Sequence, residues 1–446
     1  MARGTVFWRG LATVLLSGPW SQEAMVQRAK AGLRTSPRAR WISPLVRRIL
    51  AHFGVDGLPP TQRRLVEFLR SDAGLRRKLV ELDGEPTIDT LAVPAAQMVA
   101  FPGPSAGWSV PDWPTPRALA AWLSVDPAQL DWLADCRGRE GSHESERLRH
   151  YRYRWMGKGQ GRYRLVEAPK SRLKAVQRTI LRDVLEAIPT HEAAHAFRRG
   201  RSVLTYVGPH VGCETVLHLD LRNFFPSIRR PRIRALFRWA GYPEPVADIL
   251  AGLCSNSVSR TIVDQLAERI GFDRCERLAR IYGKPHLPQG APTSPMLANL
   301  AAYRLDCRLE GLARKIGVNY TRYADDLLFS GDREFRRRLT GFRQFVCAIA
   351  IDEGFDIQHR KTRVMTVGTR QEVAGVVLNV HPNIRREEYD RLRATLFNCV
   401  RNGPANENRE GHAHFQEHLA GRIAYVAMLN RRRGEKLLRL FERIEW

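Results

Sequence analysis

The chain has 446 residues, which is enough for two or three domains. Hydrophobic residues make up 43% and charged residues 26%, so the composition supports a folded core and excludes disorder along the whole chain. The formal net charge of +26 favours a polyanionic partner, because phosphates attract Lys and Arg and release counterions on binding. The alternative is an ordinary protein from an arginine-rich proteome.

The seven cysteines are scattered, without a CxxC pair or the Cys/His spacing of a zinc site. This pattern is typical of reduced thiols in a cytoplasmic protein. The apolar run at residues 11–16 is short for a signal-peptide core, although a signal peptide stays an alternative. No stretch approaches the length of a membrane span, so no membrane partner is expected.

Residues 1–112 show no recognisable chemistry and are expected to form a mainly helical N-terminal extension of unknown role. Amphipathic helices are predicted near residues 42–50 and 61–82. Residues 93–115 are rich in Pro, Gly and Trp, which predicts a linker or an irregular loop.

A compact pair of helices is predicted within residues 113–146. Thr115-Pro116 and Asp126-Pro127 each combine a capping side chain with a proline suited to the first helical turn. Such pairs serve in packing more often than in reading DNA, so we expect a packing unit followed by a linker.

The segment 147–182 holds twelve Lys or Arg residues against one acid, Glu167. Four aromatic residues, one of them Trp155, are interleaved with these charges. Basic groups neutralise phosphates and aromatic rings stack on bases, so the pattern indicates contact with nucleic acid or nucleotides. Arg172 and Lys174 are candidates for phosphate contacts. The alternative is a solvated basic face.

Three carboxylates carry the strongest chemical signal. Asp220 ends an apolar strand at residues 216–219, and Asp325-Asp326 lies in a turn between two β-rich flanks. Each motif alone has a plain alternative, a polar strand end or a solvated turn. Together they provide hard oxygen ligands for two Mg²⁺ ions of the kind that assist phosphoryl transfer.

These motifs resemble those of reverse transcriptases. Residues 323–326, Tyr-Ala-Asp-Asp, are similar to the family's tetrapeptide box. Asp220 followed by Phe225 resembles the first palm motif. Residues 287–295, Leu-Pro-Gln-Gly-Ala-Pro-Thr-Ser-Pro, resemble the motif that links fingers and palm, and the order and spacing match as well.

Further stretches resemble retron reverse transcriptases that carry a long N-terminal extension. The similar segments are residues 164–177, 195–202, 219–228 and 373–379. Two positions depart from the retron pattern: Ala374 stands where threonine is usual, and residues 206–210 keep only His210 of an expected Asn-Ala…His motif. Both departures concern recognition of the template RNA more than polymerisation.

The resemblance implies an α+β right-hand polymerase fold with fingers, a ferredoxin-like palm and a helical thumb, preceded by the helical extension. Fingers and palm would span residues 147–380 and the thumb residues 381–446. The implied enzyme is an RNA-directed DNA polymerase that makes branched multicopy single-stranded DNA from its own structured non-coding RNA, in antiphage defence. Its partners would be that RNA, dNTPs, the RNA–DNA hybrid product and an effector protein.

The resemblance also implies roles for single residues. The metal ligands would be Asp220, Asp325, Asp326 and the backbone carbonyl of Leu221. Residues expected at the incoming nucleotide are Arg164, Phe225, Gln289 and Gly290, with Phe225 excluding a 2′-hydroxyl. Lys361 would protonate pyrophosphate or simply bind phosphate. Tyr323 would lie beside the primer end, and His210 would contact RNA or serve as a satisfied structural histidine.

Two alternatives remain at this point. One is another bacterial reverse transcriptase of the abortive-infection, diversity-generating or maturase type. The other is a non-catalytic RNA-binding scaffold, which would not need this set of aspartates together with Phe225, Gln289 and Lys361.

Overall fold

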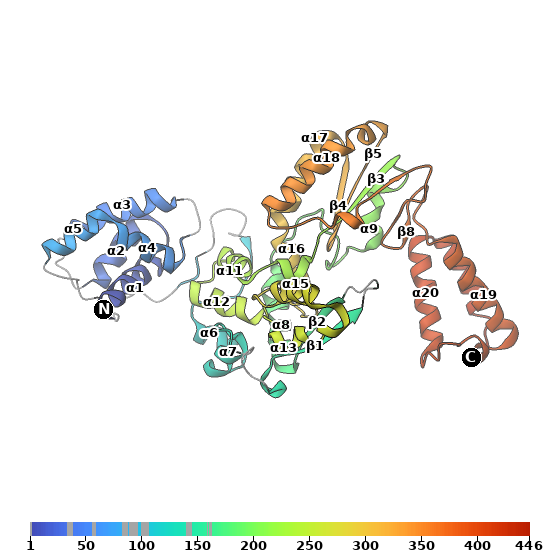
Figure 1. Cartoon of the computed structure of the whole chain (residues 1–446), viewed down its shortest axis with the longest axis horizontal. Coiled ribbons are helices and arrows are strands. Elements are labelled where there is room, and N and C mark those ends of the chain that lie inside the picture. The colour runs from blue at the N-terminus through green and yellow to red at the C-terminus, as the bar shows by residue number, and fades with distance from the viewer. Residues whose placement is uncertain are drawn as a thin grey trace. The chain divides into compact units, whose positions relative to one another are not determined.

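The computed structural model divides the chain into two compact units, residues 1–189 with 228–297 and residues 190–227 with 298–446 (Figure 1). The structure describes residues 2–33, 39–55, 59–82, 88, 97–99, 107–139, 145–157, 159 and 163–446. The predicted linker at 93–115 therefore lies outside the described residues except at 97–99 and 107–115.

Five helices begin the first unit: α1 (Ala2–Leu16), α2 (Gln22–Gly32), α3 (Ile42–Phe53), α4 (Gln62–Ser71) and α5 (Ala73–Glu81). They share one apolar core, to which every helix contributes; its members include Leu11, Met25, Ile42, Ile49, Leu65, Leu69 and Leu75. The helix predicted at 61–82 is divided at Asp72, whose carboxylate accepts a hydrogen bond from Leu75 N at 2.6 Å and caps α5. The same carboxylate binds Arg48 at 2.8 Å.

The predicted helix pair is present as α6 (Pro116–Trp122) and α7 (Pro127–Ala134). Thr115 and Asp126 accept hydrogen bonds at the two N-termini, as the sequence indicates. The pair packs on α12 (Glu244–Leu253), which also contacts α8 (Ser171–Asp183) and α11 (Arg230–Trp239). Its role in the described structure is therefore packing.

The first unit also contains an antiparallel hairpin of β1 (Tyr151–Gly157) and β2 (Tyr163–Pro169). A small apolar core joins the hairpin to α13 (Arg260–Asp264) and α15 (Phe272–Tyr282), and its members include Leu165, Val258, Ile262 and Tyr282. The short helix α14 (Ala267–Ile270) lies between α13 and α15 in the chain, and α16 (Ser294–Ala301) follows them.

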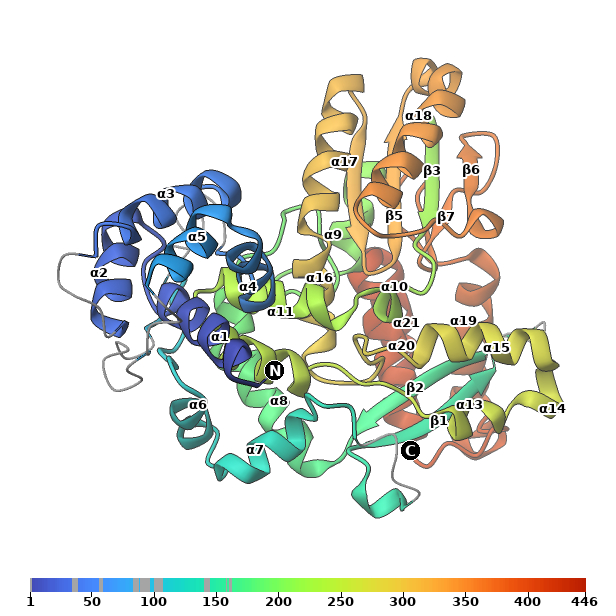
Figure 2. The same ribbon diagram turned by 60° about the vertical axis from the view of Figure 1, so that its left-hand side comes forward.

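The second unit is built on a four-stranded antiparallel sheet in the order β4-β5-β3-β6 (Figures 1 and 2). Its strands are β3 (Thr215–Asp220), β4 (Asn319–Tyr323), β5 (Asp326–Gly331) and β6 (Arg363–Thr366). Helices α17 (Tyr303–Ile316) and α18 (Arg333–Asp352) contact this sheet. Phe329 of β5 packs against Phe342 of α18 with ring centroids 5.0 Å apart, so aromatic packing joins these layers.

The C-terminal part of the second unit is helical, as predicted from Arg385 onward. It comprises α19 (Arg386–Asn402), α20 (Phe415–Leu429) and α21 (Arg431–Phe441), preceded by the short strands β7 (Glu372–Val373) and β8 (Val376–Val377). One apolar cluster runs from the sheet into these helices; among its members are Val216, Leu328, Leu392, Leu396, Leu419 and Leu437. The short helices α9 (Val203–Val207) and α10 (Phe224–Ser227) complete this unit.

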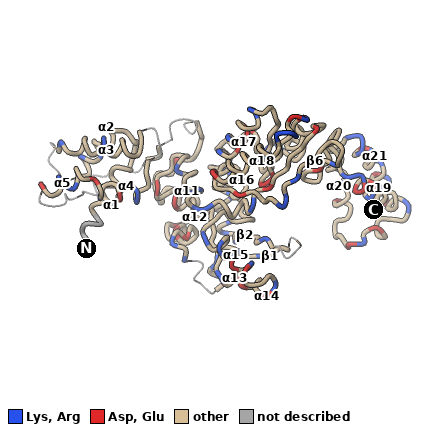
Figure 3. Tube along the Cα trace, turned by 45° about the horizontal axis from the view of Figure 1, so that its top comes forward, with Lys and Arg blue, Asp and Glu red and all other residues tan. Residues whose placement is uncertain are grey.

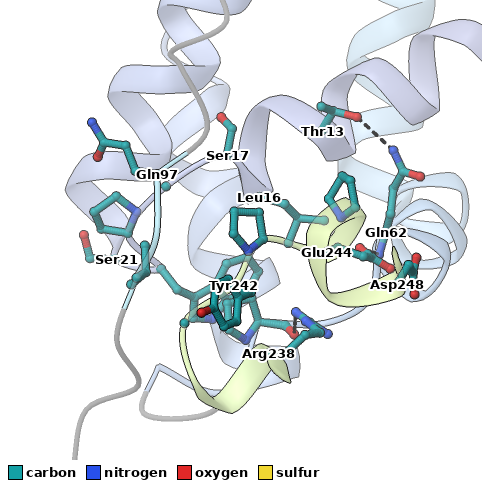
Figure 4. A pocket seen from close by; sticks show the side chains of 18 of the residues that line it. Thr13, Leu16, Ser17, Ser21, Gln62, Gln97, Arg238, Tyr242, Glu244 and Asp248 are labelled. Atoms are coloured by element: carbon teal, nitrogen blue, oxygen red, sulfur yellow. Dashed lines mark hydrogen bonds between the residues drawn. The ribbon is translucent and has the colours of Figure 1, made fainter. Parts of the chain in front are cut away.

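A cavity of about 580 Å³ lies in the first unit, where the N-terminal helices meet α11 and α12 (Figure 4). Thr13 and Gln62 on one side are joined by a 2.8 Å hydrogen bond. On the other side, Glu244 accepts a hydrogen bond from Gln62 N at 2.9 Å, and Arg238 donates to Pro59 O at 2.6 Å. These bonds tie the N-terminal helices to the rest of their unit.

All seven cysteines are free. Among the described residues, no helix combines the length and the apolar character needed to cross a membrane.

Gly252 should tolerate no side chain, because a Cβ there would lie 2.3 Å from the Ala134 carbonyl oxygen of α7. We expect Gly252→Ala to lower the free energy of unfolding by about 1–3 kcal/mol, the usual cost of overpacking. Gly311→Ala is the matched control, since a Cβ on that exposed position of α17 meets nothing within 4 Å. Alanine is the better helix former by about 1 kcal/mol, so the control should be neutral or stabilising in urea unfolding.

Candidate active site

Two carboxylates face each other at the end of the central strand pair of the second unit. In the antiparallel register of β3 and β5, Asp220 lies opposite Asp326. The neighbouring residues in the two strands, Leu219 before Asp220 and Leu327 after Asp326, are buried, which fixes the alternation of side chains. Both carboxylates are thus placed by the sheet itself.

The third carboxylate belongs to the turn between β4 and β5. Ala324 adopts a left-handed conformation with φ of 54°, which reverses the chain before Asp325. Asp325 O accepts a hydrogen bond from Leu221 N at 2.8 Å, so this turn is tied to the end of β3. Asp220, Asp325 and Asp326 are therefore brought together, as the sequence predicts.

The fully buried guanidinium of Arg322 stabilises the turn between β4 and β5. Arg322 forms two hydrogen bonds with Asp306 of α17, at 2.8 and 2.7 Å, and both side chains are 0% exposed. Arg322 also donates to Ala324 O and to Asn299 Oδ1, each at 3.1 Å. Tyr320 donates to the same Asp306 at 2.8 Å, so the pair is well supplied with hydrogen bonds.

The electrostatics of the cluster are unfavourable without a cation. Burial raises the pKa of Asp325, and the neighbouring charges of Asp326 and Asp220 raise that pKa further. The positive charge of Lys361, which binds Asp220, relieves part of the repulsion, and His218 forms a hydrogen bond with Asp326 at 2.8 Å.

The segment after α18 carries Lys361 to this place. Arg222 N donates to Asp356 O, and Gln358 N donates to Asp220 O, both at 2.7 Å. These two bonds align residues 356–358 with the end of β3, three residues before Lys361. The Lys361 side chain remains 44% exposed, which leaves its ammonium accessible from solvent.

Phe225 lies five residues after Asp220, in the short helix α10. Its ring is partly buried and packs against Phe224, with centroids 5.6 Å apart. The ring of Phe197 also contacts the Phe225 ring, with centroids 6.3 Å apart. Asn223, with φ of 49°, makes the turn that leads into this helix.

The other predicted nucleotide residues lie in the first unit and contact its hairpin. Gln289 O accepts a hydrogen bond from Glu167 N of β2 at 2.8 Å. Gly290 has φ of 130°, and a Cβ there would lie 3.0 Å from Glu167 O, so this position needs glycine. Arg164 lies in the same strand, opposite Met156 of β1.

The basic segment separates its charges from its aromatic rings. On β1, Arg152 and Arg154 are exposed, while the intervening Tyr153 and Trp155 are partly buried. Trp155 donates to Ile262 O at 3.2 Å, and Tyr153 accepts from the side chain of Asn256 at 3.1 Å. Strand alternation therefore turns these rings toward protein, which corrects the expectation that they are available to stack on bases.

Arg172 and Lys174 are both exposed on α8, next to the hairpin. Figure 3 shows that Lys and Arg are spread over both units, so charge alone does not single out one segment. The position of these two residues stays compatible with phosphate contact.

Comparison with known proteins gives the family. The model for reverse transcriptase (RNA-dependent DNA polymerase) matches residues 156–392. The Retron Mx65 reverse transcriptase of Myxococcus xanthus is 40% identical over 338 residues, which are 75% of this chain and 73% of the relative. The chain belongs to the retron-type reverse transcriptases. The predicted right-hand fold with a helical N-terminal region is confirmed, and the enzyme is an RNA-directed DNA polymerase with an RNA template.

A second relative agrees with this membership. The Retron Mx162 reverse transcriptase of Myxococcus xanthus is 34% identical over 343 residues, 74% of this chain and 67% of the relative. A solved telomerase from Candida albicans, in complex with a fragment of telomeric RNA, has 10% identity and a TM-score of 0.36. The match covers 64% of this chain and 54% of the telomerase chain, and this similarity is too low to support an inference. The retron relatives exclude the non-catalytic scaffold and favour the retron type over other bacterial reverse transcriptases.

The reverse transcriptase family implies a divalent cation, and the carboxylates at the end of β3 and β5 are the kind of ligand that such a cation prefers. Within the part of the chain that the structure describes, no group of three His, Cys, Asp or Glu side chains is arranged closely enough to hold a metal ion. Lys361 instead forms an ion pair with Asp220, and His218 forms a hydrogen bond with Asp326. A cation would replace these contacts and relieve the repulsion at Asp325.

His210 is placed differently from the RNA contact that the retron resemblance implied. It is fully buried, and its two ring nitrogens hydrogen-bond Ser330 Oγ at 2.7 Å and Thr321 Oγ1 at 2.8 Å. Burial lowers the pKa of His210 to about 3, so the ring is neutral. These contacts favour the alternative of a structural histidine, and RNA contact by this side chain is not supported.

Tyr323, which was expected beside the primer end, is partly buried, and its ring centroid lies 5.4 Å from that of Tyr206.

Sequence reasoning missed several residues that support the site. Glu167, which appeared only as one acid among many basic residues, is buried and binds Asn256 at 2.7 Å and His286 at 3.0 Å. Because Gln289 O bonds Glu167 N, this buried network fixes the strand that positions Gln289. The sequence did offer a signal, since Glu167 is the single acid in a basic segment. An acid buried in a strand needs hydrogen-bond partners, because burying an unpaired charge is costly.

Asp325→Asn should abolish polymerisation and, without divalent cations, make the protein more stable at pH 7. The amide keeps the shape but loses a ligand charge, so turnover should fall on the order of 10³-fold. Because the folded-state pKa of Asp325 is raised, its ionised form costs stability above the ordinary carboxyl pKa. The gain in Tm should therefore be present at pH 7 and vanish below about pH 4.

Primer extension on an RNA template and thermal unfolding in EDTA measure the two effects. Asp332→Asn is the control, since that carboxylate caps α18 away from the cluster. It should keep polymerase activity and show no gain in stability, because asparagine caps a helix about as well as aspartate. Turnover of Asp325→Asn at the wild-type level would contradict the assignment of the site.

Proposed function

We propose that this retron-type enzyme copies part of its own structured RNA into branched multicopy single-stranded DNA, and that it acts in antiphage defence beside an effector protein. The observation that carries the polymerase site is the convergence of Asp220, Asp325 and Asp326 at one end of β3 and β5. The retron product is supported by the similarity to the two myxobacterial retron enzymes. The free cysteines support a location in the cytoplasm, where thiols stay reduced.

In the proposed reaction, the three aspartates and the carbonyl of Leu221 would hold two Mg²⁺ ions, and these would stabilise negative charge on the reacting oxygens. The chain contributes position: β3 and β5 fix the carboxylates, and Arg322 fixes the turn between them. Lys361 holds a proton on Nζ beside Asp220 and gives it to pyrophosphate, or binds its phosphates. Tyr323 lies next to the carboxylates, beside the primer end.

Four residues are proposed to contact the nucleotide. Arg164 would bind the triphosphate or stack on the base, while Gln289 and Gly290 line the site through the backbone that packs on β2. Phe225 would lie beneath the sugar, where its ring fills the space of a 2′-hydroxyl. Its partial exposure in α10 supports this role over that of a core phenylalanine.

Phe225→Ala should admit ribonucleotides, because the space for a 2′-hydroxyl opens. A hydrophobic wall discriminates against one added hydroxyl by roughly 10²-fold, and most of that should be lost. The measurement is kcat/KM for rNTP and dNTP on one RNA template. Phe342→Leu is the control, because Phe342 is a buried phenylalanine of α18 that packs on Phe329. An unchanged ratio in Phe225→Ala would place the sugar selection elsewhere.

Arg172→Ala with Lys174→Ala should weaken RNA binding mainly at low salt. Each lost phosphate contact should flatten the slope of log affinity against log salt by about 0.7–0.9. The matched control is Arg337→Ala with Arg338→Ala, which removes the same charge from α18, where both residues pair with Glu334. A slope equal to that of the control would mean that neither Arg172 nor Lys174 touches phosphate.

The retron assignment predicts a branched product. Expression of the gene with its upstream flank should yield a small DNA attached to RNA through a 2′,5′ linkage. A debranching enzyme should shift the DNA band, and RNase alone should leave a short RNA stub. The Asp325→Asn variant controls for DNA from other sources. Absence of small DNA, or an unbranched product, would contradict the proposed product while leaving the polymerase intact.

A further inference from the structure

Phe197 is held in a conformation that a bulky residue seldom adopts. Its φ of 60° lies in the left-handed region, which favours Gly and Asn. Its ring is 46% exposed, although water contact with an apolar ring is unfavourable. Such a conformation persists only where surrounding contacts impose it, and residues of this kind cluster at functional sites.

Buried hydrogen bonds impose this conformation. The residue before Phe197 is fixed by Asn299, whose side-chain amide donates to Ala196 O at 2.8 Å. One residue earlier, His195 N donates to Arg322 O at 2.8 Å. Asn299 is fully buried, and its Oδ1 accepts from Arg322.

The same Arg322 therefore holds both the catalytic turn and the approach to Phe197. Its guanidinium donates to Ala324 O of the turn and to Asn299, and Asn299 in turn holds Ala196. The backbone that carries Phe197 is thus fixed in the same frame as Asp325 and Asp326.

The ring of Phe197 meets the ring of Phe225. The centroids are 6.3 Å apart and the planes make an angle of 61°, an edge-to-face contact. Phe224 contacts Phe225 as well, at 5.6 Å and 69°. Phe225 therefore has one aromatic neighbour from its own helix and one from the strained segment.

We propose that Phe197 is a positioning residue for sugar selection, because it keeps the Phe225 ring from turning away when a ribonucleotide enters. The inference rests on the proposed role of Phe225 as the wall against a 2′-hydroxyl. A phenylalanine wall without a lateral neighbour can change its χ1 rotamer and make room. Phe197 lies edge-to-face against the Phe225 ring, and its left-handed backbone restricts how far it can move away.

The test compares kcat/KM for rNTP and dNTP in wild type, Phe197→Asn, Phe197→Tyr, Phe225→Ala and the double variant Phe197→Asn with Phe225→Ala. Asparagine removes the ring and still accepts the left-handed backbone, so the fold should persist. We expect Phe197→Asn to raise the rNTP/dNTP ratio about tenfold, out of the roughly 10²-fold available to such a wall. Phe197→Tyr keeps the ring and should keep the ratio.

The double variant separates positioning from direct contact. If Phe197 acts through Phe225, the double variant should discriminate no worse than Phe225→Ala alone, a non-additive result. Asn299→Asp adds an independent route: it keeps an acceptor for Arg322 but removes the donor to Ala196 O, and should also raise the ratio. Thermal unfolding of each variant checks that it is folded.

The outcomes separate the two proposals. If Phe225→Ala raises the ratio and Phe197→Asn leaves it unchanged, the wall stands and the role of Phe197 is overturned. A loss of kcat for both nucleotides at constant ratio would also overturn it, because that result marks a structural role only. If Phe225→Ala itself leaves the ratio unchanged, the proposed wall fails, and the inference fails with it.

Discussion

Mutual repulsion among three carboxylates is the constraint on which the second unit depends. Asp220 and Asp326 are opposed by strand register, and Asp325 follows a left-handed residue in the adjoining turn. Burial and the two neighbouring charges raise the pKa of Asp325, so the fold keeps together groups that would separate in water. Such an arrangement is retained where function requires it, since a divalent cation converts the repulsion into coordination.

The surroundings of the carboxylates are built to withstand that repulsion. Arg322 and Asp306 form a pair with no solvent exposure, and removing one member of such a pair leaves an unpaired buried charge, at a cost of about 3–5 kcal/mol. The apolar strands beneath the site cannot shift by one residue without exposing their core face. Through Asn299 the same pair reaches Ala196, the residue before Phe197, so the proposed metal ligands and the proposed sugar wall share one hydrogen-bonded support.

Local signals in the sequence predicted much of this arrangement. The caps at Thr115 and Asp126, the apolar strand before Asp220 and the hairpin around Asp325 all follow from short-range patterns. Long-range partners were beyond reach. For His210 the sequence left RNA contact and a structural role open, because Ser330 and Thr321, which satisfy both ring nitrogens, lie more than a hundred residues away. The aromatic residues of the basic segment were expected to stack on bases. That Tyr153 and Trp155 face other protein elements could not be predicted, because their partners lie about a hundred residues away in the sequence.

The most direct test of the central claim is anomalous diffraction from crystals soaked in Mn²⁺, a substitute for Mg²⁺ with the same preference for oxygen ligands. The account predicts one or two anomalous peaks within coordination distance, about 2.0–2.3 Å, of the carboxylates of Asp220 and Asp325, with Lys361 displaced from Asp220. Peaks elsewhere, or none at a Mn²⁺ concentration that supports DNA synthesis, would contradict the assignment of these aspartates as the metal site.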